Sequence, residues 1–256
     1  IMRWGEKRYH SLDYELKQMF KEKVYKIALN GGMTCPNRDG HVGTGGCIFC
    51  SSQGSGDFAG SARLSIAEQI RQGKADISSK RPVHSYIAYF QAFTNTYAPV
   101  ETLRALYMEA IADPEVKILS IATRPDCLGA DVLALLDEIN QIKPVWVELG
   151  LQTIHPETSA YIRRGYELSV FEQAVKELRA IGITVIVHTI LYLPGETKDD
   201  MLDTIHYLNH MDIQGIKLQL LHVLTHTDLA ADYEKHPFYI PDMQDYIQFL
   251  GTCIAH

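Results

Sequence analysis

The sequence has no long hydrophobic run. No stretch of its 256 residues approaches the roughly 20 consecutive apolar residues that a membrane-spanning helix needs. The first residues, IMRWGEKRYH, are charged and aromatic, so they do not resemble the apolar segment of a secretion signal. We therefore predict a cytoplasmic protein that makes no membrane contact.

Cysteine is scarce, and its number is odd. The five cysteines stand at positions 35, 47, 50, 127 and 253. This scattered set does not form the paired framework that stabilises small secreted proteins, and free thiols persist in a reducing compartment. Metal binding or redox chemistry is therefore the first function to test for the cysteines.

An excess of basic charge is also lacking. The 24 lysines and arginines are outnumbered by 31 acidic residues, which gives a formal net charge of −7. The chain therefore has no broad basic surface for sequence-independent binding of nucleic acid. An RNA substrate would need a local patch, for which KEKVYK (21–26), Arg163 and Arg164 are candidates.

Short β-branched or aromatic runs alternate with longer amphipathic runs along most of the chain, and the 46% hydrophobic content supports a sizeable core. The predicted strands cover residues 24–30, 85–91, 117–123, 144–151, 184–193 and 215–223. The predicted helices cover residues 11–23, 65–75, 100–112, 129–140, 169–182, 197–211 and 241–254.

This alternation predicts an α/β fold with a parallel sheet and right-handed crossovers. A closed barrel needs eight units, so six units favour a partial (β/α)6 TIM-like barrel, with a doubly wound sheet as the alternative. Neither an internal repeat nor a low-complexity linker is found, so we predict a single domain over residues 1–256, in which residues 1–22 form a short N-terminal helical extension.

Three of the cysteines lie within sixteen residues, CPNRDGHVGTGGCIFC (35–50), directly after the first predicted strand. Enzymes with parallel sheets build their sites at the carboxyl ends of strands, so this position indicates function. A structural zinc would need a fourth ligand, for which His41 and Cys127 are candidates. A four-iron cluster needs only three cysteines if one iron stays open for another ligand. Inert buried thiols are a weaker alternative, because the loop is polar and rich in glycine.

The ending Cys47-Ile-Phe-Cys50 resembles the cysteine loop of the radical S-adenosylmethionine (SAM) enzymes. Eleven residues separate Cys35 from Cys47, instead of the usual three, and this longer loop is similar to that of the branch containing the catalytic subunit of Elongator. The strings NGGMTCPNRDGHVGTGGCIFC, YFQAFTNTYAPVE, TRPDCL, WVELGLQT and ILYLPGET together resemble the YhcC/YtqA-like bacterial family. Family members run some tens of residues further, so a C-terminal family segment is expected to be missing here.

The resemblance implies a radical SAM core in which Cys35, Cys47 and Cys50 hold a [4Fe-4S] cluster, and in which SAM is cleaved reductively to a 5′-deoxyadenosyl radical. Cofactor contacts are expected at the adenine, the ribose and the methionine part of SAM, from Phe49, Gln91, Asn95, Glu148, Gln152 and Arg164. Weaker candidates for the substrate side are Arg124, Asp126, Tyr192 and His222. His188 and Cys127 are each more readily explained as structural residues.

The resemblance further implies a reaction and partners. The family is associated with the wobble uridine of transfer RNA, whose carboxymethylaminomethyl side chain would be processed to aminomethyl. An electron donor such as flavodoxin or ferredoxin would reduce the cluster. Two alternatives stay open: a radical SAM enzyme that acts on a small metabolite or a protein, and a non-catalytic zinc-binding module.

Overall fold

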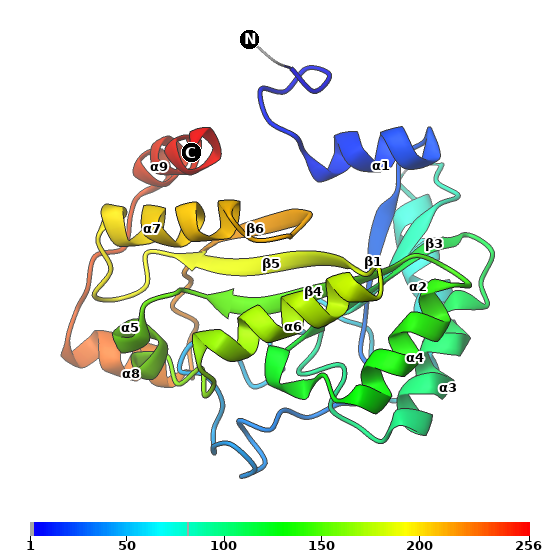
Figure 1. Ribbon diagram of the computed structural model, residues 1–256, viewed down its shortest axis with the longest axis horizontal. Helices are drawn as coiled ribbons and strands as arrows, with labels where there is room; N and C mark the ends of the chain where they lie inside the picture. Colours follow the sequence, from blue (N-terminus) through cyan, green and yellow to red (C-terminus); the bar gives the residue numbers. More distant parts are fainter. Residues whose placement is uncertain (1–2, 81) are drawn as a thin grey trace.

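Six parallel strands form the centre of the molecule (Figure 1). The computed structural model describes residues 3–80 and 82–256. The strands are β1 (Tyr25–Leu29), β2 (Tyr86–Phe90), β3 (Val116–Thr123), β4 (Val145–Gln152), β5 (Thr184–Leu191) and β6 (Gly215–Leu220). Each of the six predicted strands is confirmed to within a few residues.

Helices connect the strands and flank both ends of the sheet. They are α1 (Leu12–Phe20), α2 (Ile66–Ser78), α3 (Val100–Ile111), α4 (Ala130–Asn140), α5 (Pro156–Tyr161), α6 (Leu168–Ala180), α7 (Lys198–Asn209), α8 (Asp228–Lys235) and α9 (Met243–Ala255), with a 3-10 turn η1 (Pro125–Cys127). The short helices α5 and α8 were not predicted, because six or eight residues give too little periodicity to detect.

The strand order decides between the two predicted architectures. The strands follow one another in the sheet as β1-β2-β3-β4-β5-β6, and all neighbours are parallel. A doubly wound sheet reverses its strand order at a switch point, and this sheet does not. Right-handed crossovers in one direction place the helices on one face and curl the sheet, so the partial (β/α)6 barrel is confirmed and the doubly wound alternative is wrong.

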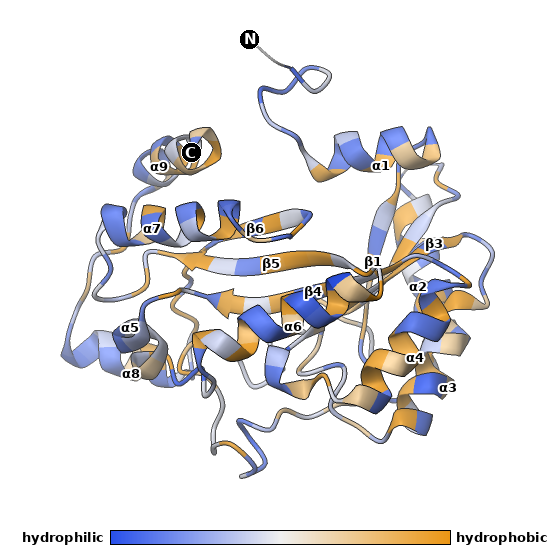
Figure 2. Cartoon of the chain, in the orientation of Figure 1, coloured by the Kyte–Doolittle hydropathy of each residue, from blue (hydrophilic) through white to orange (hydrophobic). Residues whose placement is uncertain are grey.

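The main hydrophobic core lies between the sheet and the outer helices. It joins alternate strand residues such as Leu29, Phe90 and Val187 to helix residues such as Tyr107 and Phe171. Apolar and polar bands alternate along α4 and α6 in Figure 2, as expected for helices that bury one side. Among the described residues, no helix has both the length and the apolar character that crossing a bilayer requires.

The N-terminal helix α1 covers part of the inner face of the curled sheet. Leu16 packs in a separate cluster with Val24, Ile87, Ile118 and Trp146. These strand residues lie near the amino ends of the strands and point away from the outer helices. Helix α1 therefore closes this end of the half-barrel, while the carboxyl ends of the strands stay available for a site.

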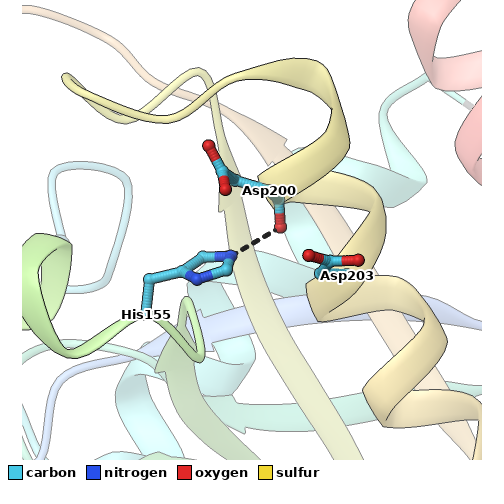
Figure 3. Close-up of side chains that lie close together, drawn as sticks. All are labelled: His155, Asp200 and Asp203. Atoms are coloured by element: carbon cyan, nitrogen blue, oxygen red, sulfur yellow. Dashed lines mark hydrogen bonds between the residues drawn. The ribbon is translucent and has the colours of Figure 1, made fainter.

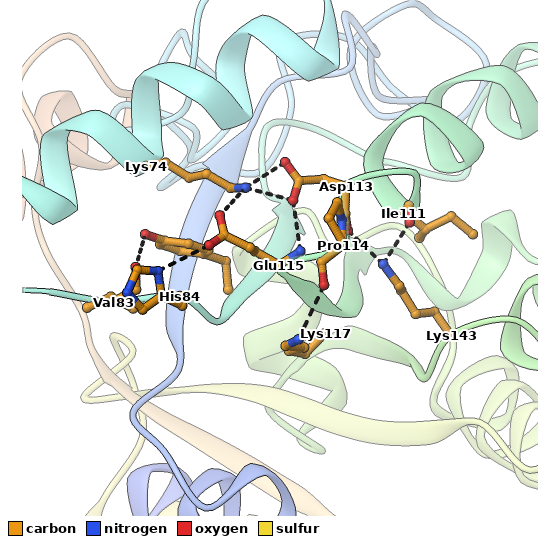
Figure 4. A network of polar contacts seen from close by, with 10 residues as sticks. Lys74, Val83, His84, Ile111, Asp113, Pro114, Glu115, Lys117 and Lys143 are labelled. Atoms are coloured by element: carbon orange, nitrogen blue, oxygen red, sulfur yellow. Dashed lines mark hydrogen bonds and ion pairs between the residues drawn. The ribbon is translucent and has the colours of Figure 1, made fainter.

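Charged groups link the outer elements at the amino ends of β2 and β3 (Figure 4). Lys74 of α2 donates to both Asp113 and Glu115 at 2.6 Å, and His84 lies 3.3 Å from Glu115. Lys143 donates to the main-chain oxygens of Ile111 and Asp113. This network lies at the end of the sheet opposite to the cysteine loop, so its contribution is to the scaffold.

Candidate functional site

The cysteine loop leaves β1 at its carboxyl end and crosses the mouth of the half-barrel. Gly60 donates its main-chain N–H to Ala28 of β1, and Ile48 donates to Ile162 at the end of α5. Asn37 reaches the same region through a bond from Nδ2 to the main-chain oxygen of Arg163 at 2.6 Å. The loop is therefore attached to both sides of the curled sheet.

Several glycines in the loop have conformations that other residues rarely adopt, and at two of them a side chain would also clash. Gly46, directly before Cys47, has φ +84°, and a Cβ there would lie 2.9 Å from Nε of Arg38. Gly54 has φ +58°, and a Cβ there would overlap the ring of Phe93. The glycine content that the sequence shows thus lets this backbone turn beside the thiols.

Cys35, Cys47 and Cys50 line one cavity of about 270 Å³. Asn37 Nδ2 lies 3.5 Å from Cys47 Sγ, and Ser55 Oγ lies 3.4 Å from Cys50 Sγ. Burial, together with the neighbouring Cys50, raises the pKa of the Cys47 thiol to about 12. The free thiol is therefore protonated at neutral pH, and a bound metal would displace its proton.

The spacing of the three thiols bears on which metal they fit. A single tetrahedral zinc at about 2.3 Å from each sulfur would hold the sulfurs about 3.8 Å apart. Within residues 3–80 and 82–256, the three cysteine sulfurs do not all lie within 4.8 Å of one another. Three thiols around a wider space fit a multi-iron cluster better than one zinc ion, and the cavity beside them offers room for a further ligand.

Each of the six strands has at least one polar side chain that faces the interior below the cysteines. These residues form a group that we call the polar floor: Lys26, Tyr89, Ser120, Glu148, His188 and Lys217. The ammonium of Lys26 bonds Glu148 and lies 4.2 Å from the centre of the Tyr89 ring. Ser120 Oγ donates to Glu148 at 2.7 Å, and His188 Nε2 lies 2.6 Å from the other carboxylate oxygen.

Burial and charge set the protonation of this floor. Burial alone would raise the pKa of Glu148, but the bond from His188 and the charge of Lys26 outweigh it and hold that pKa far below its usual value. Burial lowers the pKa of His188 in spite of the adjacent carboxylate. Burial also lowers the pKa of Lys217. At neutral pH Glu148 is therefore an anion, and His188 is neutral.

Two arginines that the sequence singled out form part of the cavity wall. Arg124 makes an ion pair with Asp126 at 2.7 Å and donates to the main-chain oxygen of Arg164 at 2.8 Å. The guanidinium of Arg164 donates to the main-chain oxygens of Leu151, Thr153 and Tyr166. These bonds use four of its five N–H groups, so one N–H remains for a ligand, where the expected carboxylate clamp would use two.

Most of the predicted site residues meet at this cavity. Besides the three cysteines, its lining includes Phe49, Gln91, Arg124, Glu148, Gln152, Arg164 and His222. Their expected roles toward SAM or substrate stay predictions. For Glu148, the two oxygens already have three protein partners, which differs from the free carboxylate that a ribose contact would use.

Three predicted residues do not line the cavity. Asn95 is fully buried, and its Nδ2 donates to the main-chain oxygens of Phe90 and Ala122. Asp126 is held by its arginine partner, Arg124, and lines a different cavity. Tyr192 has φ +65° directly after β5, and its side chain packs against Phe249 of α9. These three side chains therefore lie outside the cavity that the cysteines line, and their expected roles stay predictions.

Lys26 and Lys217 were missed as site residues. Each lies among apolar residues of a short strand, where a lysine is costly to bury unless the strand faces a polar space. Since side chains alternate along a strand, their positions in YKIAL and GIKLQL could have marked the inner face.

Two further groups lie outside this cavity. Cys127 lines the second cavity, with His41 and Asp126. His155 lies near Asp200 and Asp203 (Figure 3), where its Nε2 is 2.8 Å from the main-chain oxygen of Asp200. The Asp200 carboxylate accepts bonds from Thr197 at the start of α7. These bonds explain the group of His155, Asp200 and Asp203 as structural: they join the start of α7 to the segment after β4.

Comparison with known proteins places the chain among relatives. The sequence profile of the Radical SAM superfamily matches residues 37–208. YtqA of Bacillus subtilis is 46% identical over 245 residues, which cover 96% of this chain and 76% of YtqA. YhcC of Escherichia coli K12 is 38% identical over 244 residues, which cover 94% of this chain and 77% of YhcC.

A solved structure gives the same fold. The archaeal Methanocaldococcus infernus Elp3 with an N-terminal deletion matches with a TM-score of 0.69 at 15% identity. The match covers 90% of this chain and 53% of that Elp3 chain. At this identity the likeness concerns the architecture, and the chain spans about half of the Elp3 structure.

Proposed function

The chain belongs to the radical SAM superfamily, and from this membership we propose that it is a [4Fe-4S]- and SAM-dependent enzyme that modifies the wobble uridine of transfer RNA. The observation that carries the enzymatic part is that three thiols, on a loop at the carboxyl ends of the strands, open into one cavity with a buried polar floor. A structural metal site would need neither the cavity nor the floor.

Cys35, Cys47 and Cys50 would hold the cluster and leave one iron for SAM. When bound, the reduced cluster and SAM supply the one-electron chemistry that removes a hydrogen atom from a substrate. The chain orients the ligands and keeps water from them. Phe49, Gln91 and Gln152 lie on the wall where they can contact SAM, and an electron donor such as flavodoxin or ferredoxin would reduce the cluster.

The proposed reaction is the conversion of carboxymethylaminomethyluridine to aminomethyluridine. Similarity to YtqA and YhcC over most of the chain supports it, because that family resemblance implies a transfer RNA substrate. The shape of the fold also supports it: a half-barrel with free edges at β1 and β6 leaves a wide mouth for a macromolecule.

The test begins with anaerobic reconstitution with iron and sulfide, followed by an assay for reductant-dependent formation of 5′-deoxyadenosine from SAM. We expect the native chain and Cys253→Ala to form the product and Cys47→Ala to form none, because Cys253 lies on the buried side of α9, which packs against α7 and not at the cavity. Product from Cys47→Ala at the native rate would contradict the proposed cluster site.

The substrate is tested by adding transfer RNA that carries carboxymethylaminomethyluridine and analysing its nucleosides by mass spectrometry. We expect aminomethyluridine to accumulate with the native chain and not with Cys47→Ala. If 5′-deoxyadenosine forms but the nucleoside is unchanged, the enzyme proposal holds and the transfer RNA proposal fails.

A small metabolite or a protein is the second candidate substrate. The net charge of −7 favours it, since the chain as a whole repels the RNA backbone. The two candidates differ in how binding depends on salt. Affinity for transfer RNA should fall steeply between 50 and 200 mM salt, roughly in proportion to the number of phosphates contacted. No measurable binding at the lower salt would favour the second candidate.

A further inference from the structure

We propose that Lys217 forms a subsite in the polar floor that binds a carboxylate of the substrate, an inference that rests on the proposed enzymatic function. Lys217 lies on the inner face of β6 and lines the cavity, where its side chain is half-buried. In the described part of the chain, its ammonium has no hydrogen bond or ion pair. A half-buried lysine that lacks a partner is costly to keep unless a ligand supplies one.

The charges of the floor do not balance. The floor contains the two ammonium groups of Lys26 and Lys217 but only one carboxylate, that of Glu148. Glu148 is bonded by Lys26, Ser120 and His188, and its side chain is 1% exposed. One positive charge therefore remains, and it is located at Lys217.

The remaining cations of the cavity wall have other neighbours. Arg38 donates to the main-chain oxygen of Ser51, Arg124 pairs with Asp126, and Arg164 donates to the main-chain oxygens of Leu151 and Thr153. The charged groups that act on Lys217 are Glu148 and Lys26. Lys217 thus belongs to a part of the cavity distinct from the cysteine end, where SAM would bind its iron.

Depth in the fold separates the two ends. Lys217 is three residues before the last residue of β6, which at about 3.3 Å per residue places it about 10 Å below the strand ends. Its strand partner is His188 of β5. A ligand group that reached Lys217 would therefore extend past the cysteine loop into the barrel, as the reacting end of a substrate would.

A single unpaired ammonium fits a single negative charge. A carboxylate needs one cationic partner and accepts hydrogen bonds from groups beside it, whereas a phosphate dianion would leave charge uncompensated. The uridine of the proposed reaction carries one carboxylate at the end of its side chain. The subsite would hold this group and would distinguish the substrate from the product, which lacks it.

The experiment compares two nucleosides, carboxymethylaminomethyluridine and aminomethyluridine, by titration calorimetry against the reconstituted protein with SAM bound. We expect the native chain to bind the first nucleoside about tenfold or more tightly than the second, because a charge-assisted bond is lost with the carboxylate. Lys217→Gln should remove this preference, and Lys217→Arg should keep most of it. Lys176→Gln, at an exposed position of α6, is the matched control.

Each outcome either supports or overturns the proposal. A preference retained in Lys217→Gln, or an equal loss of SAM affinity in that variant, would overturn it. N-methylglycine serves as a second probe, because it carries the carboxylate without the nucleoside. Binding of this probe that depends on Lys217, with no modification of transfer RNA, would support the subsite while the proposed transfer RNA substrate fails. If transfer RNA is modified and Lys217→Gln does not change the KM, the transfer RNA substrate is supported and the proposed subsite is rejected.

Discussion

The buried carboxylate of Glu148 links its own strand, β4, to three other strands, each through one side chain. Lys26 of β1, Ser120 of β3 and His188 of β5 all bond it. We expect Glu148→Gln to lower the free energy of unfolding by about 2 to 4 kcal/mol, because it leaves Lys26 without its counter-charge. Urea unfolding at pH 7 measures this, and Glu234→Gln, at an exposed position of α8, is a control expected to change stability by less than about 0.5 kcal/mol.

The comparison of the native chain with Glu148→Gln also predicts how stability depends on pH. The pKa of Glu148 is held below its ordinary value of 4.5 in the folded state, so its ionised form stabilises the fold. That contribution is complete above the unfolded pKa and is lost as the pH falls below it. The difference in stability between the native chain and Glu148→Gln should therefore be constant from pH 6 to 7 and narrow below about pH 4.5. A difference that widens in acid would contradict this assignment.

Among individual residues, the sequence predicts the shared position of the three thiols better than it predicts the positions of the other site candidates. Cys35, Cys47 and Cys50 share one short segment, so their spacing alone indicates a common ligand. The role of Arg164 depends on main-chain oxygens that only folding brings near it. Tyr192 lies outside the cavity for a similar reason, since one left-handed residue after β5 turns its side chain toward α9.

The first helix, α1, stabilises the closed end of the half-barrel. Leu16 is 4% exposed and packs against inner residues of β2, β3 and β4, whereas Leu12 on the same helix is 45% exposed. Leu16→Ala should cost about 2 to 4 kcal/mol through lost burial and the cavity left behind. Leu12→Ala should cost less than about 1 kcal/mol. Equal losses in chemical denaturation would show that α1 does not pack against the sheet.

The charged network between α2 and the start of β3 makes a smaller contribution. Lys74 bonds two carboxylates, but its side chain and that of Asp113 are each 20% or more exposed. We expect Lys74→Met to lower stability by about 1 kcal/mol at low salt and by less at 1 M salt, since solvent and ions screen such pairs. Lys176→Met is the matched control, and thermal unfolding at both salt concentrations is the measurement. A loss that does not depend on salt would point to packing instead of charge.

The regular helices and strands explain why the fold was predictable from the sequence. Long amphipathic helices and apolar strands carry their periodicity in the sequence, so α6 and β4 were found within a few residues. The order of strands in the sheet followed from the rule for crossovers and from the count of six. The packing of α1 against the inner face of the sheet could not be predicted, because Leu16 and the residues it contacts in β3 and β4 are about a hundred residues or more apart in the sequence.

For the whole molecule, the cysteine loop acts as a connection between distant elements. It bonds β1 through Gly60, the end of α5 through Ile48, and the start of α8 through the N–H of Leu229, which donates to Ile48. Between β1 and α2 the loop contains no helix or strand within the described residues, so these bonds and the thiols determine its shape. A metal cluster held by three cysteines would therefore tie the two sides of the half-barrel together.

This connection predicts that loading the site stabilises the entire chain. A ligand at a thousand times its dissociation constant adds about 4 kcal/mol, which in a chain of this size raises the unfolding midpoint by about 8 to 16 °C. Anaerobic calorimetry of the protein before and after reconstitution measures the rise, and the amides of Ile48 and Leu229 should become more protected from hydrogen exchange. Cys253→Ala should show the same rise, because Cys253 lies on the side of α9 that packs against α7, and Cys47→Ala should show none. A rise in Cys47→Ala equal to that of the native chain would mean that iron binds elsewhere and that the loop does not connect the two sides.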